Sequence, residues 1–170
     1  MVTPDKDFAQ LVDESIYMYR PVFGGGYEIW GVNEVLEKFE ISQTSQVIDF
    51  LAMKGDSVDN IPGLPGVGDK TAKKFLKEFG SLEGLLQNTN ELKGKLKEKI
   101  EQNKELGVLS KKLATIITDV PIDYNIEELK LNVTNLDKAR KIFEELEFRR
   151  IISSLNSIFS INNEKNKSSG

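Results

Sequence analysis

The sequence predicts an α/β fold that is mostly helical. Apolar residues recur with the three- and four-residue spacing of helices through the middle and the C-terminal part of the chain. Two β-leaning runs, 15–22 and 27–30, flank three consecutive glycines at 24–26, which predicts a β-hairpin. Val2 and Thr3 resemble the end of another strand, so we expect a small sheet near the N-terminus and helices after it.

The helices follow from capping and breaker residues. Phe8, Leu11 and Val12 predict a helical turn, and Asn33 is expected to cap a short helix with Val35, Leu36 and Phe39 on one face. Further helices are expected from Ser42 or Thr44 to a stop at Gly55, over 69–79 before Gly80, over 82–86 after Ser81, and over 92–100. A last helix is expected to open at 134 and either to continue or to restart as far as Leu155. The β-branched run 114–120 predicts a strand that ends at Pro121, and the polar residues 162–170 predict a disordered tail.

The composition excludes several classes of protein. With 170 residues and a hydrophobic fraction of 39%, the chain is long and apolar enough for one domain with a core. It has no cysteine and no histidine, which excludes a disulfide framework, a thiolate zinc site and an imidazole base. No run approaches the roughly 18 apolar residues of a membrane span, so no membrane partner is expected.

Charge is distributed unevenly along the chain. Residues 1–60 carry 4 basic and 11 acidic side chains, whereas residues 61–112 carry 11 basic and 7 acidic ones. The basic middle part suits a polyanion such as nucleic acid, although the total net charge is −4. Ordinary scatter among solvated faces explains the same asymmetry, so charge alone does not decide between the two.

Four aspartates stand in two closely spaced pairs. Asp5 and Asp7 follow the predicted strand end, and Asp56 and Asp59 follow a predicted helix. Carboxylate oxygens are the ligands of hard divalent cations, and four of them suit two Mg²⁺ ions that activate water and stabilise a leaving oxygen. Each pair taken alone is also typical of turns and caps.

A glycine-rich turn leads into the predicted helix over 69–79. Its glycines, Gly63, Gly66 and Gly68, permit positive φ angles and close approach of a ligand to the backbone. N–H groups at the following helix start would then point at a phosphate, which would give sequence-independent, salt-sensitive binding. The residues expected to take part are Gly63, Gly66, Val67, Gly68, Lys70, Thr71, Lys73 and Lys74. An ordinary helix–turn–helix with solvated lysines is the alternative.

Two further groups are open to two interpretations. The aromatic residues of the hairpin suit either base stacking or a hairpin core with surface aromatics; they are Tyr17, Tyr19, Phe23, Tyr27 and Trp30. The alternating lysines at 93, 95, 97 and 99 suit either a solvated helix face or contacts to a nucleic-acid backbone.

These motifs together resemble the 5′-nuclease domain of bacterial DNA polymerase I, in the flap-endonuclease superfamily. The resemblance covers nearly the whole chain except its tail. It rests on residues 3–12 (TPDKDFAQLV), 47–72 (VIDFLAMKGDSVDNIPGLPGVGDKTA), 109–116 (LSKKLATI) and 145–150 (ELEFRR).

The resemblance implies a Mg²⁺-dependent hydrolase, with Mn²⁺ as a substitute, that removes 5′ flaps and 5′ ends from DNA. Asp5, Asp7, Asp56 and Asp59 match the family's metal-site aspartates. Residues 44–79 match its helix–three-turn–helix, and the turn at 63–68 resembles one that holds K⁺ against a DNA phosphate. The implied parts are the remnant of a parallel-sheet nuclease core with a hairpin (1–43), a helix-hairpin-helix DNA-binding subdomain (44–115), a closing strand and helix (116–160) and a tail (161–170).

The family pattern also has upstream aspartates and a basic helical arch, and the sequence matches only the C-terminal half of the nuclease domain. We therefore expect a segment of a longer, DNA polymerase I-like protein of the bacterial cytoplasm and nucleoid, with little or no turnover of its own. The alternative is a helix-hairpin-helix module that grips duplex DNA without cutting it. A scaffold domain with incidental lysines is a third possibility.

Overall fold

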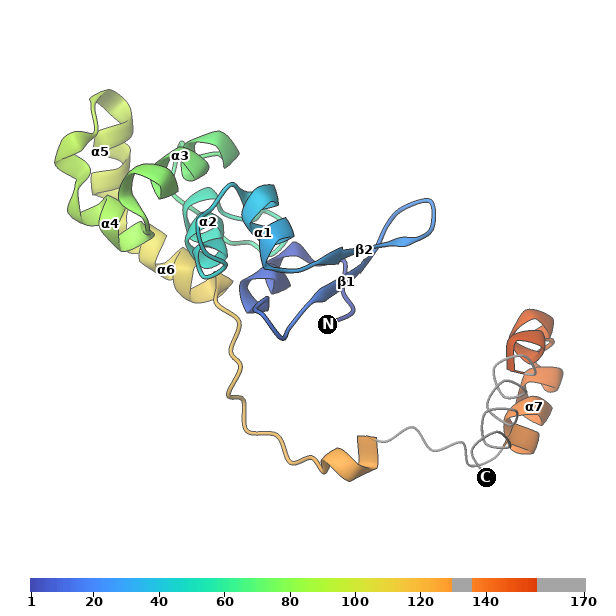
Figure 1. Cartoon of the computed structure of the whole chain (residues 1–170). Coiled ribbons are helices and arrows are strands. Elements are labelled where there is room, and N and C mark those ends of the chain that lie inside the picture. The colour runs from blue at the N-terminus through green and yellow to red at the C-terminus, as the bar shows by residue number, and fades with distance from the viewer. Residues whose placement is uncertain (130–135, 156–170) are drawn as a thin grey trace. The chain divides into compact units, whose positions relative to one another are not determined.

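The computed structural model describes residues 1–129 and 136–155. Its contacts divide the chain into two units, Met1–Val120 and Pro121–Gly170, which are described separately. The first unit is mostly helical with a small antiparallel sheet, as the sequence predicts (Figure 1). Among the described residues, no helix is long and apolar enough to cross a membrane.

The N-terminal part contains the predicted hairpin. Its strands are β1 (Met18–Pro21) and β2 (Tyr27–Trp30), with Met18 opposite Trp30. Val2 forms a single parallel bridge to Tyr19, in place of a longer strand. The expected helical turn is a 3₁₀-helix, η1 (Lys6–Leu11).

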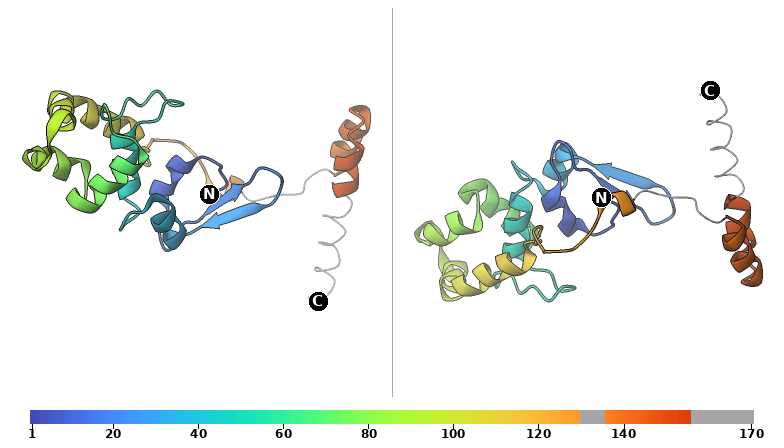
Figure 2. Two further views of the ribbon diagram at one scale, coloured as in Figure 1. Left: turned by 90° about the horizontal axis from the view of Figure 1, so that it is seen from above. Right: turned by 90° about the horizontal axis from the view of Figure 1, so that it is seen from below.

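Six α-helices complete the first unit. Their bounds are α1 (Val32–Phe39), α2 (Gln46–Lys54), α3 (Asp69–Phe79), α4 (Leu82–Gln87), α5 (Gly94–Gln102) and α6 (Lys104–Ala114), with a 3₁₀ turn, η2 (Thr89–Glu91), between α4 and α5. Helix α2 is buried on most of its surface and packs against both α3 and α6 (Figure 2). The core therefore centres on α2, and the chain segments at its two ends are fixed by that packing.

Helix starts follow the expected chemistry with two shifts. α1 begins one residue before Asn33, because the Gly31 N–H donates to the Glu34 carboxylate (2.8 Å). α2 begins at Gln46, whose side-chain oxygen accepts the Ser42 N–H (2.8 Å). The Gln46 amide also donates to the carbonyl of Gly80 (2.7 Å), so it joins the start of α2 to the end of α3.

The predicted strand over 114–120 is wrong. Helix α6 runs to Ala114, and residues 115–125 have no regular secondary structure. The amide of Gln10 takes the place of a pairing strand: it donates to the Ala114 carbonyl and accepts the Ile116 N–H, both at 2.9 Å. β-branched residues favour extended backbone, but a strand forms only where a neighbouring strand accepts its N–H groups.

The second unit contains η3 (Ile126–Leu129) and α7 (Leu136–Glu145). A left-handed Glu147 (φ 55°) interrupts the predicted helix, which resumes over 149–155. Thr134 and Asn135, expected to cap this helix, lie outside the described residues, as does the predicted tail.

Candidate metal and nucleic-acid site

Three of the four predicted aspartates converge. One carboxylate oxygen from each of Asp7, Asp56 and Asp59 lies within 4.8 Å of the others. Asp7 comes from η1, whereas Asp56 and Asp59 come from the turn after α2. The fold thus brings together two segments that are about fifty residues apart.

The turn that carries Asp56 is closed by its own backbone. Asp56 and Ile61 exchange two backbone hydrogen bonds, at 2.9 and 2.8 Å. The Asp56 carboxylate accepts the Val58 N–H (2.9 Å), and Asn60 takes the left-handed conformation that the turn needs (φ 56°). Asp56 is therefore oriented before any ligand arrives.

Asp5 lies outside this cluster. Its carboxylate accepts the Asp7 N–H (3.0 Å) and so caps η1. It is exposed to solvent, and its negative charge acts on the neighbouring Asp7 of the cluster. A capping role accounts for this residue in the structure, and a role as metal ligand stays a prediction.

Lys6 forms an ion pair with Asp56 that pattern analysis missed. Its ammonium contacts the Asp56 carboxylate, whose side chain is only 8% exposed. The hydrogen bond from Lys6, with that from the Val58 N–H, lowers the pKa of Asp56 below its usual range. The same hydrogen bond raises the pKa of Lys6. The position of this lysine between Asp5 and Asp7 was the available signal.

Asp7 is in the opposite electrostatic situation. Burial, together with the charge of Asp5, raises the pKa of Asp7 above its usual value. One of its carboxylate oxygens is buried and has no hydrogen-bond partner among the described residues. A buried carboxylate oxygen is costly without a partner, and a cation held by three carboxylates would supply one. The donor set therefore fits a hard divalent ion.

The glycine turn is anchored at its first glycine. Gly63 (φ +68°) packs against the backbone of Gly55 (φ +77°), so closely that a Cβ on residue 63 would lie 2.5 Å from the Gly55 nitrogen. The Gly63 N–H donates to the buried Ser110 hydroxyl (3.0 Å), and the Val67 N–H donates to the Leu64 carbonyl (3.0 Å). These two N–H groups are thus used inside the fold rather than directed at a ligand. Sequence reasoning missed Ser110.

Around the buried Val67, the exposed residues of the turn and of the helix start are Gly66, Gly68, Asp69 and Lys70. Gly66 and Gly68 are exposed, and Gly68 precedes α3 without a side-chain cap. The first N–H groups of α3 therefore face a position where an anion would be favoured. Leu96 and Lys99 of α5 lie over Gly66, where a Cβ would meet them at 3.6–3.7 Å. Lys99 thus joins this surface.

The predicted DNA-binding lysines differ in their exposure and in their ion pairs. Lys70 and Lys74 are exposed, and Thr71 is half-buried. Lys73 is held by Glu40 (3.2 Å) and by Asp69 (3.1 Å). Lys74 pairs with Glu78 (3.6 Å), but its side chain is 67% exposed. Lys70 and Lys74 are therefore the more accessible partners for an anion.

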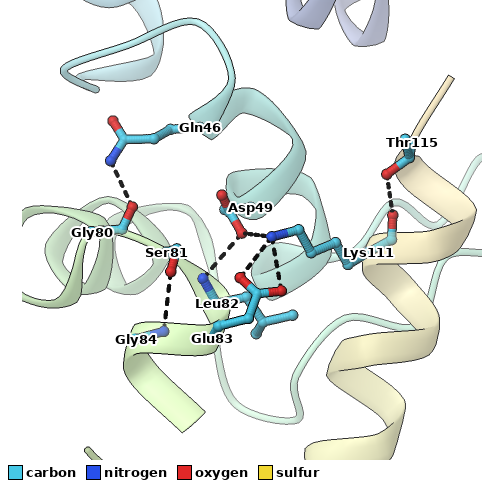
Figure 3. Close-up of polar contacts among 9 residues, drawn as sticks. All are labelled: Gln46, Asp49, Gly80, Ser81, Leu82, Glu83, Gly84, Lys111 and Thr115. Atoms are coloured by element: carbon cyan, nitrogen blue, oxygen red, sulfur yellow. Dashed lines mark hydrogen bonds and ion pairs between the residues drawn. The ribbon is translucent and has the colours of Figure 1, made fainter. Parts of the chain in front are cut away.

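An ion-pair network around the buried Asp49 carboxylate connects helices of the first unit (Figure 3). The carboxylate of Asp49 in α2 accepts the Leu82 N–H at the start of α4 (3.0 Å) and contacts the ammonium of Lys111 in α6 (2.7 Å). Lys111 also binds both Glu83 oxygens, at 2.9 and 2.7 Å. The network joins α2, α4 and α6 around one ammonium, and the sequence pattern gave no sign of it.

Residues 42–137 match the family model described as 5′-3′ exonuclease, C-terminal SAM fold. The chain belongs to this 5′-3′ exonuclease family. Membership confirms the family predicted from the motifs at 3–12 and 47–72, and the turn and helix that follow Asp56 lie inside the matched range.

Similar proteins support this assignment. The chain is 37% identical over 158 residues to a DNA polymerase I of Caldicellulosiruptor bescii, covering 91% of this chain and 18% of that protein. It is 34% identical over 157 residues to a 5′-3′ exonuclease of Aquifex aeolicus, covering 92% and 52%. The chain thus spans about half of the exonuclease and less than a fifth of the polymerase.

Among solved structures, the fold is similar to a variant of the bacteriophage T5 D15 flap endonuclease, described as a pseudo-enzyme-product complex with DNA and metal ions. The TM-score is 0.57 at 23% identity, covering 66% of this chain and 41% of that one. This likeness concerns the fold.

Proposed function

We propose that this chain is the part of a 5′→3′ exonuclease or flap endonuclease that completes a divalent-metal site and grips duplex DNA next to it. The metal is Mg²⁺, with Mn²⁺ as a substitute. The observation that carries the proposal is the convergence of Asp7, Asp56 and Asp59 within 4.8 Å, beside a glycine turn that opens onto the uncapped start of α3.

Asp7, Asp56 and Asp59 would hold the ion, with Asp5 next to them. The ion supplies Lewis acidity that activates water and stabilises a leaving oxygen at a phosphodiester. The chain's own contribution is orientation: Val58 fixes Asp56, and the buried, unpartnered oxygen of Asp7 offers a strong acceptor. Because the chain has no histidine, carboxylates, lysines or hydroxyls must supply any acid–base chemistry.

DNA binding is proposed to use the segment 66–74 and Lys99. N–H groups at the start of α3 would contact one backbone phosphate, with Lys70, Lys74 and Lys99 around it. A monovalent ion, K⁺, is proposed to sit between the glycine turn and that phosphate. Since no base edge is read, binding should be independent of sequence and should weaken steeply with salt.

The proposed substrate is a 5′-flap or nicked duplex, met during DNA replication and repair in the bacterial cytoplasm. The names of the relatives support this, because they include DNA polymerase I and 5′-3′ exonuclease. In the parent protein, the rest of a DNA polymerase I chain would be the partner of this segment.

Fluorescence anisotropy of a labelled 5′-flap duplex tests the DNA-binding part. With Ca²⁺ present to suppress turnover and at low salt, we expect saturable binding that K⁺ strengthens relative to a larger monovalent cation. Lys70→Glu with Lys74→Glu should weaken binding by about tenfold or more, and Lys99→Glu by about threefold.

Lys97→Glu is the matched control. It makes the same charge change on the same helix, two residues from Lys99 and so on another face. Equal losses for Lys97→Glu and Lys99→Glu would show only a general charge effect. Undiminished binding by the Lys70/Lys74 double variant would contradict the proposed surface.

Measuring cleavage and binding side by side distinguishes a nuclease from a module that binds DNA without cutting it. Asp56→Asn should abolish any Mg²⁺-dependent cleavage by the chain and leave duplex affinity within about twofold. Binding without cleavage in the unsubstituted chain would favour the non-cutting DNA-binding module.

A further inference from the structure

Lys6 places an ammonium on the carboxylate that the metal would use. We propose that Lys6 is a resident counter-cation of the aspartate cluster and that it competes with the divalent ion for Asp56. This inference rests on the metal site proposed above and adds a residue that sets the affinity of that site.

The contact between Lys6 and Asp56 matters because the Asp56 carboxylate is nearly buried. The Asp56 side chain is 8% exposed, and one of its oxygens is already engaged by the Val58 N–H. Lys6 contacts the other oxygen, which accepts no backbone hydrogen bond from Val58 and so faces a cation most directly. A charged carboxylate that is nearly buried is costly without such a partner.

Lys6 faces a group of negative charges that no other described cation pairs with. Three carboxylates converge here, and Asp5 adds a fourth negative charge from the neighbouring position. Lys54 lines the same surface hollow as Lys6 but pairs with Asp69 (3.7 Å). Within the described residues, Lys6 is the only cation in an ion pair with one of the three clustered aspartates.

The Lys6 side chain can move away from Asp56 while the backbone stays in place. Its side chain is 42% exposed and lies on the wall of a solvent-open hollow that Gly55, Asp56 and Pro62 also line. Its backbone belongs to a short 3₁₀-helix whose buried contact is made by Ala9. Displacement by a divalent ion thus requires rotation of one flexible side chain.

Binding of Mn²⁺ to the full chain, measured by isothermal titration calorimetry, tests this inference. Removing the ammonium should free Asp56, so Lys6→Met and Lys6→Gln should each lower the Kd for Mn²⁺ by about tenfold. Lys6→Arg keeps the charge and should stay within about threefold of the unsubstituted chain.

Thermal melting gives a second readout. Without metal, Lys6→Met and Lys6→Gln should melt at a lower temperature, because three aspartates lose their counter-charge. Saturating Mn²⁺ should then raise the melting temperature of these variants by more than it raises that of the unsubstituted chain. Lys54→Met, in the same hollow but paired elsewhere, is the control and should change neither readout.

The outcomes distinguish this inference from the site on which it rests. Suppose that Mn²⁺ binds to the unsubstituted chain, that Asp56→Asn abolishes this binding, and that the neutral Lys6 variants bind Mn²⁺ no more tightly. The proposed competition is then overturned, and the metal site stands. If Mn²⁺ binds none of these proteins, both are overturned. Weaker binding by the neutral Lys6 variants would make Lys6 a support for the ion and would also overturn competition.

Discussion

Gly55 and Gly63 lie back to back, and this contact positions the residues between them. Both have positive φ angles. A Cβ added to Gly55 would lie 2.7 Å from the Ile61 carbonyl oxygen, and a Cβ added to Gly63 would lie 2.5 Å from the Gly55 nitrogen. The Gly63 N–H is held by Ser110, which in turn donates to the Leu106 carbonyl (2.7 Å). Asp56 and Asp59 therefore stand on a loop with both ends clamped.

Gly63→Ala should destabilise the chain by about 2 kcal/mol or more. The new Cβ combines a disfavoured φ with a backbone clash that no side-chain rotation relieves. Urea unfolding followed by circular dichroism measures the loss. Gly68→Ala is the control, since residue 68 has a negative φ and nothing within 4 Å of the added Cβ, and it should stay within about 0.5 kcal/mol. Equal losses for both would contradict the clamp.

At this scale, sequence spacing predicted the aspartates but not the residues that orient them. Asp56 and Asp59 share a short turn, so their proximity follows from local geometry. The contacts from Lys6 to Asp56 and from Ser110 to Gly63 join residues about fifty positions apart, and these depend on how α2, α6 and η1 pack. Asp5 stands only two residues from Asp7, but it caps the 3₁₀-helix that carries Asp7 and lies outside the cluster, a difference that spacing alone does not predict.

Helices α2, α4 and α6 meet at the Asp49–Lys111–Glu83 network. Burial raises the pKa of Glu83, but the hydrogen bond from Lys111 outweighs it, and the pKa lies below its usual value. Burial lowers the pKa of Lys111, but the hydrogen bonds that its ammonium donates to Asp49 and Glu83 outweigh this effect, and the pKa is raised. Glu83 thus adds stability above its unfolded-state pKa and loses it as pH falls through the lower folded value. Lys111 adds stability below its unfolded-state pKa and loses it as pH rises through the higher folded value.

Lys111→Met should lower the free energy of unfolding at pH 7 by about 2 kcal/mol, because it leaves the nearly buried Asp49 carboxylate without its cation. The variant should also lose less further stability than the unsubstituted chain as the pH falls below about 4.5, the usual Glu value. Urea titrations at several pH values measure both effects. Lys112→Met, on the exposed neighbour, should follow the unsubstituted curve. If the two variants behaved alike, the network would not be stabilising.

Elements with strong local signals were predicted well. The stripe of Ala72, Phe75 and Leu76 gave the bounds of α3, and the Ser81 side chain does accept the Gly84 N–H at the start of α4. Helix α6 was missed, since its buried positions include Gly107 and Ser110, which carry little hydrophobic signal. The wrong strand over 114–120 came from the same cause: propensity is local, whereas pairing depends on the partner that the fold supplies.

At the scale of the whole molecule, the buried apolar core found among the described residues lies within one unit. The buried hydrophobic residues of the described chain run from Ala9 to Ala114. Both the aspartate cluster and the glycine turn lie inside this range, in the unit Met1–Val120. The core and the candidate site should therefore persist without the residues that follow.

A chain of residues 1–120 should melt cooperatively within a few degrees of the full chain's main transition. Circular dichroism melts measure this, and limited proteolysis of the full chain should yield a fragment that ends near the same place. Residues 1–105 form the control, since this chain lacks Ser110 and Ala114 of the core and should not melt cooperatively. Loss of cooperativity in the 1–120 chain would show that its stability depends on the second unit.

The close contact of Gly55 with Gly63 also constrains how the length of this chain can vary among relatives. A residue inserted or deleted between them would separate two backbones that now touch, and would move Asp56 and Asp59 away from Asp7. The hairpin tip at 24–26 and the irregular stretch 117–124 carry no such constraint. Changes in length should therefore accumulate at those two places, and the interval from residue 55 to residue 63 should keep one length wherever the site is retained.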